Sequence, residues 1–413
     1  MKKSGIRRKK GAKKAPSIRR GEKAPRRPLI RIKVVGVGGG GGNAVSRMGR
    51  DFGVRGIEFI AINTDLQDLD YCEADQKVHI GKFVTKGMGA GMDPELGLQA
   101  AEENRAEISE ILKDADMVFI AAGFGGGTGT GAAPAIAEIA RENGALTVAV
   151  VTKPFTFEGS ARREIAEEGI IKLKDKVDTF LIIPNDRVFN IIDNDTPVIK
   201  AFEKIDDILK SAVQGVAEII AATGLINVDF ADVKAIMSRA GMSVIGVGTA
   251  SGPERAVKAV AQATNSPLLE TPIDNAKGVL FGVSGGRDLK MVEVNEAAKI
   301  IAEKADPGAK IIFGAYNDKK LKKGHMKIVL IATGFSGLTL KSEIDLSSLL
   351  NSQNSVLDFG EARGSKARNE ESLNKELREK QEKSRKILGG EVPDSSRDEE
   401  TWEIPAFLRR KKR

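Results

Sequence analysis

Gly125-Gly126-Gly127-Thr128-Gly129-Thr130-Gly131 is the stretch around which the chain is organised. It follows an apolar run, residues 116–122, and precedes a run of small residues, 132–140, so the sequence predicts a strand, a glycine loop and the start of a helix. In that arrangement backbone N–H groups and the helix dipole point at an anion, and glycine lets the backbone approach phosphate oxygens. No Lys follows the last glycine, which excludes a Walker loop. A flexible glycine linker is the alternative, but linkers are not framed by a buried strand and a helix.

Two further glycine-rich stretches lie near other predicted strands. Residues 36–43 follow the β-rich run 29–35, and residues 87–91 precede Asp93-Pro94, which predicts an N-cap and a helix running to about Leu112. More strands are expected at residues 57–62, 146–151 and 179–183. Strands that alternate with helices predict a doubly wound, mostly parallel α/β sheet with ligands at its carboxyl edge. Three glycine loops at that edge indicate one nucleotide with several phosphates.

The first glycine stretch also fits a different kind of site. Gly36, Gly38 and Gly41 satisfy the dinucleotide fingerprint G-x-G-x-x-G between a strand and a helix. An NAD site would need a carboxylate that ends the second strand, and Glu58 or Asp65 is available. An NAD-dependent oxidoreductase is therefore an alternative, although it leaves the other two glycine loops unexplained.

Residues 196–223 are predicted to form one long helix, with Thr196 as its N-cap and Gly224 as its stop. At about 1.5 Å per residue this helix is roughly 40 Å long, enough to link two domains. Phe202 and Asp206 are four residues apart and share a helix face. A ring that stacks on a base and a carboxylate that accepts from guanine N1–H and N2–H would select guanine. Alternatively, Phe202 belongs to the core and Asp206 is a solvated charge.

The segment after the long helix carries two carboxylates, Asp229 and Asp232. They open a predicted helix, so they could be its N-cap and a first-turn acid. They could also position water for phosphoryl transfer. The spacing alone favours the capping interpretation. Residues 225–335 then alternate strands and helices without a nucleotide-type loop, which predicts a second, smaller α+β domain.

The two ends of the chain differ from this core. Residues 1–28 are predicted to be a basic, disordered extension. Residues 1–27 hold thirteen Lys or Arg and one acidic residue, Glu22, so they carry +12 while the whole chain is only +8 and the remainder is −4. Such an arm binds anionic lipid or nucleic acid, or is simply solvated.

Residues 336–398 are polar and charged, which predicts a disordered linker and a disordered C-terminal tail. Residues 399–413 end that linker with an apolar cluster and a basic run. An apolar cluster without a core of its own predicts a docking peptide, and its basic residues could contact anionic lipid.

Cysteine and hydrophobic content limit the class of protein further. Cys72 is the one cysteine in 413 residues, which excludes an internal disulfide, suits a reducing cytoplasm and predicts a buried thiol. His79 and His325 lack neighbours at ligand spacing, so no zinc site is expected. No apolar run is long enough to span a bilayer or to serve as a signal core.

The glycine stretch 125–131 resembles the tubulin/FtsZ signature G-G-G-T-G-[ST]-G, and residues 29–335 as a whole resemble the FtsZ family of tubulin-like division GTPases. The resemblance implies a GTP-binding domain at 29–195, a central helix at 196–224 and a C-terminal domain with the catalytic loop at 225–335. The final peptide is similar to the family's tail motif, whose partner-binding residues would be Ile404, Pro405, Phe407, Leu408 and Arg409.

The resemblance also implies a set of functional residues. GTP would be bound by Gly38, Gly39, Gly40, Gly41, Gly42, Asn43, Ala90, Gly91, Gly127, Thr128, Gly129, Glu158, Arg162, Asn185, Phe202 and Asp206. Within that set Glu158 and Arg162 would face the ribose. Asn185, Phe202 and Asp206 would surround guanine, and the glycine-rich remainder would hold the phosphates.

Asn227, Asp229 and Asp232 match the family's catalytic loop, which acts on the nucleotide of the next subunit. The long helix would hold this loop about 40 Å from the phosphate edge, too far to act within one chain. The implied cofactors are GTP or GDP and a water-mediated Mg²⁺, for which Asp65 is a candidate.

The implied function is a cytoplasmic GTPase that polymerises head to tail and scaffolds the division ring at mid-cell on the inner membrane face. Its partners would be further copies of itself and membrane-anchoring or regulatory division proteins bound through the tail, with anionic lipid at the basic termini and no nucleic acid. Three departures are visible: Gly42 replaces a usual Asn, Met92-Asp93 is more acidic than usual, and the arm of residues 1–28 is longer and more basic than is typical of the family. A non-hydrolysing structural relative is the alternative, against which the intact Asp229 and Asp232 argue.

Overall fold

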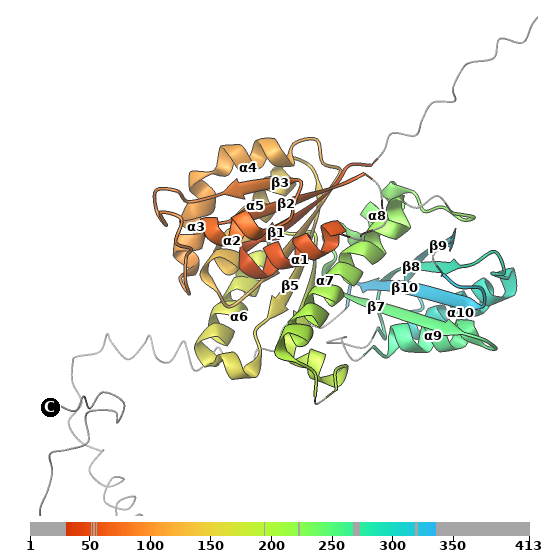
Figure 1. Ribbon diagram of the computed structural model, residues 1–413. Coiled ribbons are helices and arrows are strands. Elements are labelled where there is room, and N and C mark those ends of the chain that lie inside the picture. The colour runs from red at the N-terminus through yellow and green to blue at the C-terminus, as the bar shows by residue number, and fades with distance from the viewer. Residues whose placement is uncertain are drawn as a thin grey trace, which may run out of the picture. The chain divides into compact units, whose positions relative to one another are not determined.

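The computed structural model describes residues 30–335, except positions 51, 53, 55, 194, 222–223, 267–272 and 319–320. The predicted basic extension, linker and docking peptide lie outside the described residues. Within the described part, ten strands form one sheet in the order β3-β2-β1-β4-β5-β6-β7-β10-β8-β9. Helices cover both of its faces (Figure 1). The predicted doubly wound α/β architecture is confirmed.

The first six strands are parallel and correspond to the predicted nucleotide-binding half. They are β1 (Ile32–Val37), β2 (Ile57–Asn63), β3 (Gln76–His79), β4 (Met117–Gly123), β5 (Leu146–Lys153) and β6 (Thr179–Pro184). Val34 lies between Phe59 of β2 and Phe119 of β4 in register. Because β1 and β4 are buried on both faces, they read as continuous apolar runs in the sequence.

The remaining strands are mostly antiparallel. They are β7 (Gly241–Ser251), β8 (Gly278–Gly285), β9 (Lys310–Asn317) and β10 (His325–Thr333). The start of β7 pairs with β6 in parallel, and the strand then pairs with β10 in antiparallel register. β8 runs antiparallel to β10 and parallel to β9. This change of direction separates the predicted α+β region from the parallel half.

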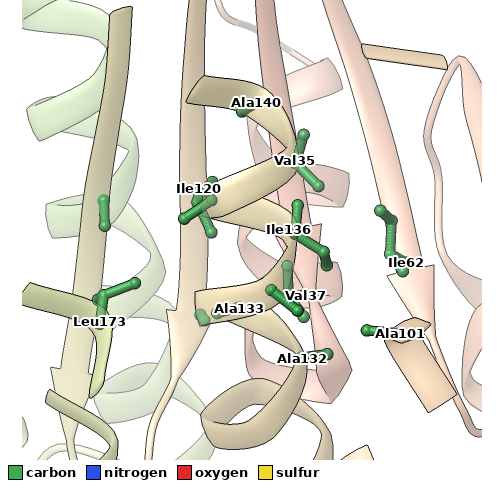
Figure 2. Close-up of a cluster of buried hydrophobic side chains, with 14 of the residues drawn as sticks. Val35, Val37, Ile62, Ala101, Ile120, Ala132, Ala133, Ile136, Ala140 and Leu173 are labelled. Atoms are coloured by element: carbon green, nitrogen blue, oxygen red, sulfur yellow. The ribbon is translucent and has the colours of Figure 1, made fainter. Parts of the chain in front are cut away.

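Two layers of helices enclose the parallel half. One layer consists of α3 (Pro94–Glu103), α4 (Arg105–Leu112), α5 (Gly127–Glu142) and α6 (Ser160–Lys174). Figure 2 shows Ile136 of α5 among Val35, Val37 and Ile120 of the sheet. The alanines of α5 let this helix approach the strands closely, which explains its run of small residues.

The opposite layer consists of α1 (Gly38–Arg50), α7 (Val198–Ala221) and α8 (Phe230–Met237). Its core also includes Leu280 of β8 and Ile331 of β10, so α7 packs against both halves of the sheet (Figure 1). The other face of the antiparallel half is covered by α9 (Arg255–Thr264) and α10 (Met291–Lys304). The short α2 (Leu66–Tyr71), η1 (Thr156–Glu158) and η2 (Asn185–Asn190) follow strands β2, β5 and β6.

Some local predictions differ from the structure. The helix expected to run to about Leu112 is two helices, α3 and α4, which meet at Asn104. The predicted Thr196 cap is wrong, because α7 begins at Val198 and the Pro197 carbonyl accepts the first helical bond, from Ala201 N at 3.1 Å. β3 was not predicted, since four residues are too few to show a period. No described helix combines the length and apolar character needed to cross a bilayer.

Candidate nucleotide site and the acidic loop

The first and third glycine stretches meet because β1 and β4 are neighbours in the sheet. Gly38 has a φ of +70°, and a Cβ added to it would lie 3.0 Å from the Gly129 nitrogen. Both stretches begin helices, α1 at Gly38 and α5 at Gly127. Gly126, the N-cap of α5, provides no side-chain acceptor, so the N–H groups of Thr128 and Gly129 in the first turn remain available to an anion.

The second glycine stretch packs against the third. The Gly127 nitrogen donates to the Gly91 carbonyl at 2.7 Å. A Cβ on Gly127 would lie 2.6 Å from the Ala90 carbonyl oxygen, so only glycine allows this approach. All three predicted loops therefore line one edge of the sheet. Asp93, the unusually acidic residue beside them, is occupied as the N-cap of α3 and accepts from Glu95 N and Leu96 N.

Two carboxylates that follow β2 lie beside these loops. Asp65, the sequence candidate for a metal ligand, is the N-cap of α2 and accepts from the Gln67 and Asp68 nitrogens at 3.0 and 3.1 Å. Asp68 was missed by the sequence analysis. Its Oδ2 lies 3.1 Å from where a Cβ on Gly39 would be and accepts from Asn63 Nδ2 at 2.7 Å. Burial raises the pKa of Asp68, Asp65 adds to this, and the hydrogen bond from Asn63 opposes it.

An aromatic and amide cluster lies where the base was predicted. The Phe202 ring meets Phe155 edge-on, with centroids 5.7 Å apart, yet Phe202 is 47% exposed. It is therefore not a core residue. Asn185 is buried, and its Oδ1 has no hydrogen-bond partner among the described residues. A buried acceptor without a partner is costly, which indicates that a ligand group belongs there.

Asp206 is half-buried on the same stretch of α7 as Phe202. Burial raises its pKa to about 6, while Arg47 of α1 opposes that rise and Asp207 and Glu203 add to it. Arg47, which the sequence analysis also missed, donates from Nε to Asp207 at 2.8 Å and pairs with Glu203 at 3.5 Å. Asp206 therefore keeps a partly desolvated carboxylate that has no hydrogen-bond partner among the described residues, so it is not the solvated charge of the alternative interpretation.

Glu158 and Arg162 lie between the phosphate loops and this cluster. Arg162 Nη1 donates to Glu158 Oε2 at 2.8 Å, and Glu158 Oε1 accepts from Phe155 N at 2.9 Å. The Arg162 carbonyl lies 2.9 Å from where a Cβ on Gly125 would be. The structure thus brings the three glycine loops, this pair and the aromatic cluster to adjoining positions along one edge.

The acidic loop lies beyond the opposite end of α7. Asn227, Asp229 and Asp232 are all exposed. Asp229 occupies the N-cap position of α8, but its side chain makes no capping hydrogen bond. The predicted positions are confirmed, with Asp229 as N-cap residue and Asp232 in the first turn, but the Asp229 side chain does not cap the helix. Asn227 Oδ1 accepts from Gly224 N at 2.7 Å, which fixes the loop that carries the two carboxylates.

The NAD alternative lacks its carboxylate. Glu58 is near the amino end of β2, away from the glycine loops, and pairs with Lys33 at 3.2 Å. Asp65 is occupied as an N-cap.

Cys72 is buried as predicted, and its thiol donates to the Gly42 carbonyl at 3.3 Å.

Comparisons with known proteins agree with this arrangement. The GTPase domain of the tubulin/FtsZ family matches residues 31–193, and the C-terminal domain of the FtsZ family matches residues 241–336. The solved FtsZ dimer of M. jannaschii is 46% identical with a TM-score of 0.70, over 74% of this chain and 88% of that one. CetZ2 of Haloferax volcanii, solved as a GTPγS-bound protofilament, shares the fold at 21% identity and a TM-score of 0.64, over 79% of this chain and 98% of that one.

A nucleotide edge built from three glycine loops, joined by one long helix to a second domain, defines a tubulin-like GTPase fold. The chain belongs to the FtsZ family within the tubulin/FtsZ family.

Proposed function

We propose that this chain binds GTP, polymerises head to tail and hydrolyses GTP at a site that the acidic loop of the neighbouring subunit completes. The observation that carries this proposal is the position of Asp229 and Asp232, which are exposed and lie beyond the far end of α7. The helix has 24 residues, which gives it a length of about 36 Å. Two carboxylates so far from the phosphate edge act on a nucleotide only if it belongs to another subunit.

The nucleotide would lie along the carboxyl edge of the parallel strands. The α and β phosphates would face the helix N-termini at Gly38 and Gly127, and Ala90 and Gly91 would lie near the γ-phosphate. Glu158 and Arg162 would contact the ribose. Guanine would stack on Phe202, donate to Asp206 from N1–H and N2–H, and satisfy the buried Asn185 oxygen.

Magnesium fits this edge through Asp68 rather than through Asp65. Asp68 presents a carboxylate of raised pKa against Gly39, where the β and γ phosphates would be, and carboxylates are preferred ligands of Mg²⁺. Asn63 would orient it by its hydrogen bond to Oδ2. The Mg²⁺ ion would neutralise phosphate charge. Asp68 would hold the ion, directly or through water.

In the proposed reaction the neighbour's Asp229 and Asp232 orient and polarise a water molecule that attacks the γ-phosphorus. The bond between that phosphorus and the bridging oxygen breaks, which leaves GDP and inorganic phosphate. Asn227 holds the loop through its bond to Gly224. Hydrolysis would thus depend on assembly, and the solved dimer and protofilament of the relatives support assembly of this kind.

The test is GTP turnover per subunit measured against protein concentration. We expect negligible turnover in dilute solution and a steep rise above a threshold, because the site forms between subunits. Turnover per subunit that stays constant down to high dilution would show a self-contained site and would overturn the role given to the acidic loop.

We further propose that residues 399–413 dock on membrane-anchoring division proteins and that the filaments form the division-ring scaffold at mid-cell, in the cytoplasm. Removal of residues 399–413 should leave polymerisation unchanged and abolish binding to such a partner. The measurement is co-sedimentation of filaments with the partner, and equal binding by the truncated chain would contradict the docking role.

A further inference from the structure

The outer face of the parallel half carries a groove that the proposed function does not use. It lies between α3 and α6 above α5 and has a volume of about 440 Å³. Its floor is apolar, with Leu98, Ala135 and Ile165. Its rim is acidic on balance, with four carboxylates and two lysines: Glu95, Glu102, Glu138, Glu168, Lys172 and Lys176. An apolar floor with an acidic rim suits a segment that offers both an aliphatic side chain and positive charge.

The rim is only partly neutralised within the fold, because Lys176 pairs with Glu138 while the other carboxylates are less fully compensated. Glu168 is exposed and has no ion pair or hydrogen bond among the described residues. Glu102 shares Arg105 with Glu142, so one cation serves two carboxylates. Glu95 pairs with Lys172 across the groove at 2.9 Å, but both side chains are more than half exposed, and such a pair contributes little and opens readily.

The acidity continues along α3 and α4 to the point where the basic N-terminal arm begins. Residues 93–116 contain eight acidic and two basic residues. Arg31 already pairs with Asp114 at 3.2 Å, and its nitrogen donates to Asp116 at 2.8 Å. The +12 arm therefore leaves the fold directly beside the acidic face, and tethering gives it a high effective concentration there.

The arm carries a sequence that matches the groove. Ile6-Arg7-Arg8 and Ile18-Arg19-Arg20 each place one aliphatic residue before two guanidinium groups. Ile18 is twelve positions before residue 30, where the described fold begins, which gives a reach of up to about 40 Å. The path from Asp114 to Glu102 follows α4, whose eight residues rise only about 12 Å.

We propose that Ile18-Arg19-Arg20 docks in the groove between α3 and α6 of its own chain, with Ile18 on the apolar floor and the two arginines on Glu102 and Glu168. Arginine suits this role because its guanidinium pairs with carboxylates in a bidentate manner. Docking holds the arm against the GTP-binding half and withdraws its positive charge from other anionic partners.

The first test is limited trypsin digestion of the full chain, which cleaves at arginine. In the wild type, cleavage after Arg19 and Arg20 should be about three- to tenfold slower than in a Glu102→Gln, Glu168→Gln variant, because only the undocked arm is cut. Salt at about 0.5 M should remove the difference. The matched control is Glu296→Gln with Glu303→Gln on α10, which should cleave like the wild type. Equal cleavage in wild type and groove variant would overturn the proposal.

The second test separates the occupants. An Ile18→Cys, Ile165→Cys variant should form an intrachain disulfide under mild oxidation, at a rate independent of protein concentration. The native Cys72 stays in place because it is buried and burial raises its pKa. Interchain disulfides that increase with concentration would show that the arm binds a second copy. Failure to cross-link, with cleavage of the arm slowed only by anionic vesicles, would assign it to a lipid surface. Either result would overturn docking within the chain.

Discussion

The two ends of α7 carry carboxylates in opposite situations. At the first end Asp206 is half-buried, faces Arg47 and has its pKa raised to about 6. It adjoins the rings and the glycine loops, so the chain builds that end by itself. At the other end Asp229 and Asp232 are exposed, and the Asp229 side chain does not even cap its helix. A desolvated carboxylate such as Asp206 can bind a ligand within one chain. The exposed carboxylates Asp229 and Asp232 can form a site only when a second molecular surface covers them.

The largest effect is expected where the acidic loop is altered. Asp232→Ala should lower GTP turnover by about 10²–10⁴-fold, because the water loses its polarising group, while GTP affinity of the dilute subunit stays unchanged. Turnover and nucleotide binding are measured separately. Glu296→Ala on the exposed face of α10 is the control and should hydrolyse normally. Unchanged turnover in Asp232→Ala would remove the distinction between the two ends of α7.

A substitution in the glycine loops tests whether the nucleotide end is rigidly packed. A Cβ on Gly41 would lie 2.3 Å from the Ala121 carbonyl oxygen, so Gly41→Ala should lower the free energy of unfolding by about 1–3 kcal/mol. The neighbouring Gly42 is the matched control, since its Cβ would meet only Cys72 Sγ, at 3.6 Å. Gly42→Ala should be neutral or stabilising by up to about 1 kcal/mol, because alanine favours helix. Denaturant unfolding of both variants decides the matter, and equal stability would show a loosely packed loop.

The raised pKa of Asp206 predicts a pH dependence at the base end alone. Guanine requires the ionised carboxylate, so affinity for GDP should fall about tenfold for each pH unit below about 6. The folding stability of the nucleotide-free protein has the opposite pH dependence. The contribution of Asp206 to the free energy of unfolding is fully present below pH 3.8, its ordinary pKa, and is lost as pH rises through about 6. Asp206→Asn should bind weakly at all pH values with a flat profile. If the affinity of the wild type for GDP does not change between pH 5 and pH 7, the proposed contact between Asp206 and guanine is contradicted.

The smallest effect is expected at Asp68. Asp68→Asn should raise the Mg²⁺ concentration required for half-maximal GTP binding by about tenfold, because one ligand charge is lost. The conservative change keeps the side-chain size. Asp70→Asn, on the exposed side of α2, is the control and should leave the Mg²⁺ requirement unchanged. If Asp68→Asn leaves the Mg²⁺ requirement unaltered, Asp68 is not a ligand and the ion is held by phosphate and water alone.

Much of the fold was predictable because buried parallel strands leave long apolar runs. Strands β1, β2, β4, β5 and β6 were expected within a few residues of their bounds. The four-residue β3 and the break at Asn104 were not, since a short edge strand and a kink between two helices of the same face leave no periodic signal. Arg47 and Asp68 were missed for a related reason: each acts on a residue far away in the sequence.

The sequence by itself determined the class of fold, the three glycine loops and the resemblance to the tubulin/FtsZ family, because glycine where backbones must approach closely is a local requirement. Only the tertiary structure decided which carboxylates are engaged. Asp65 and Asp93 cap helices, Asp206 is desolvated beside Arg47, and Asp229 and Asp232 stay exposed. The sequence shows where a carboxylate is but not its surroundings, and its role depends on the donors, charges and water that the fold places around it.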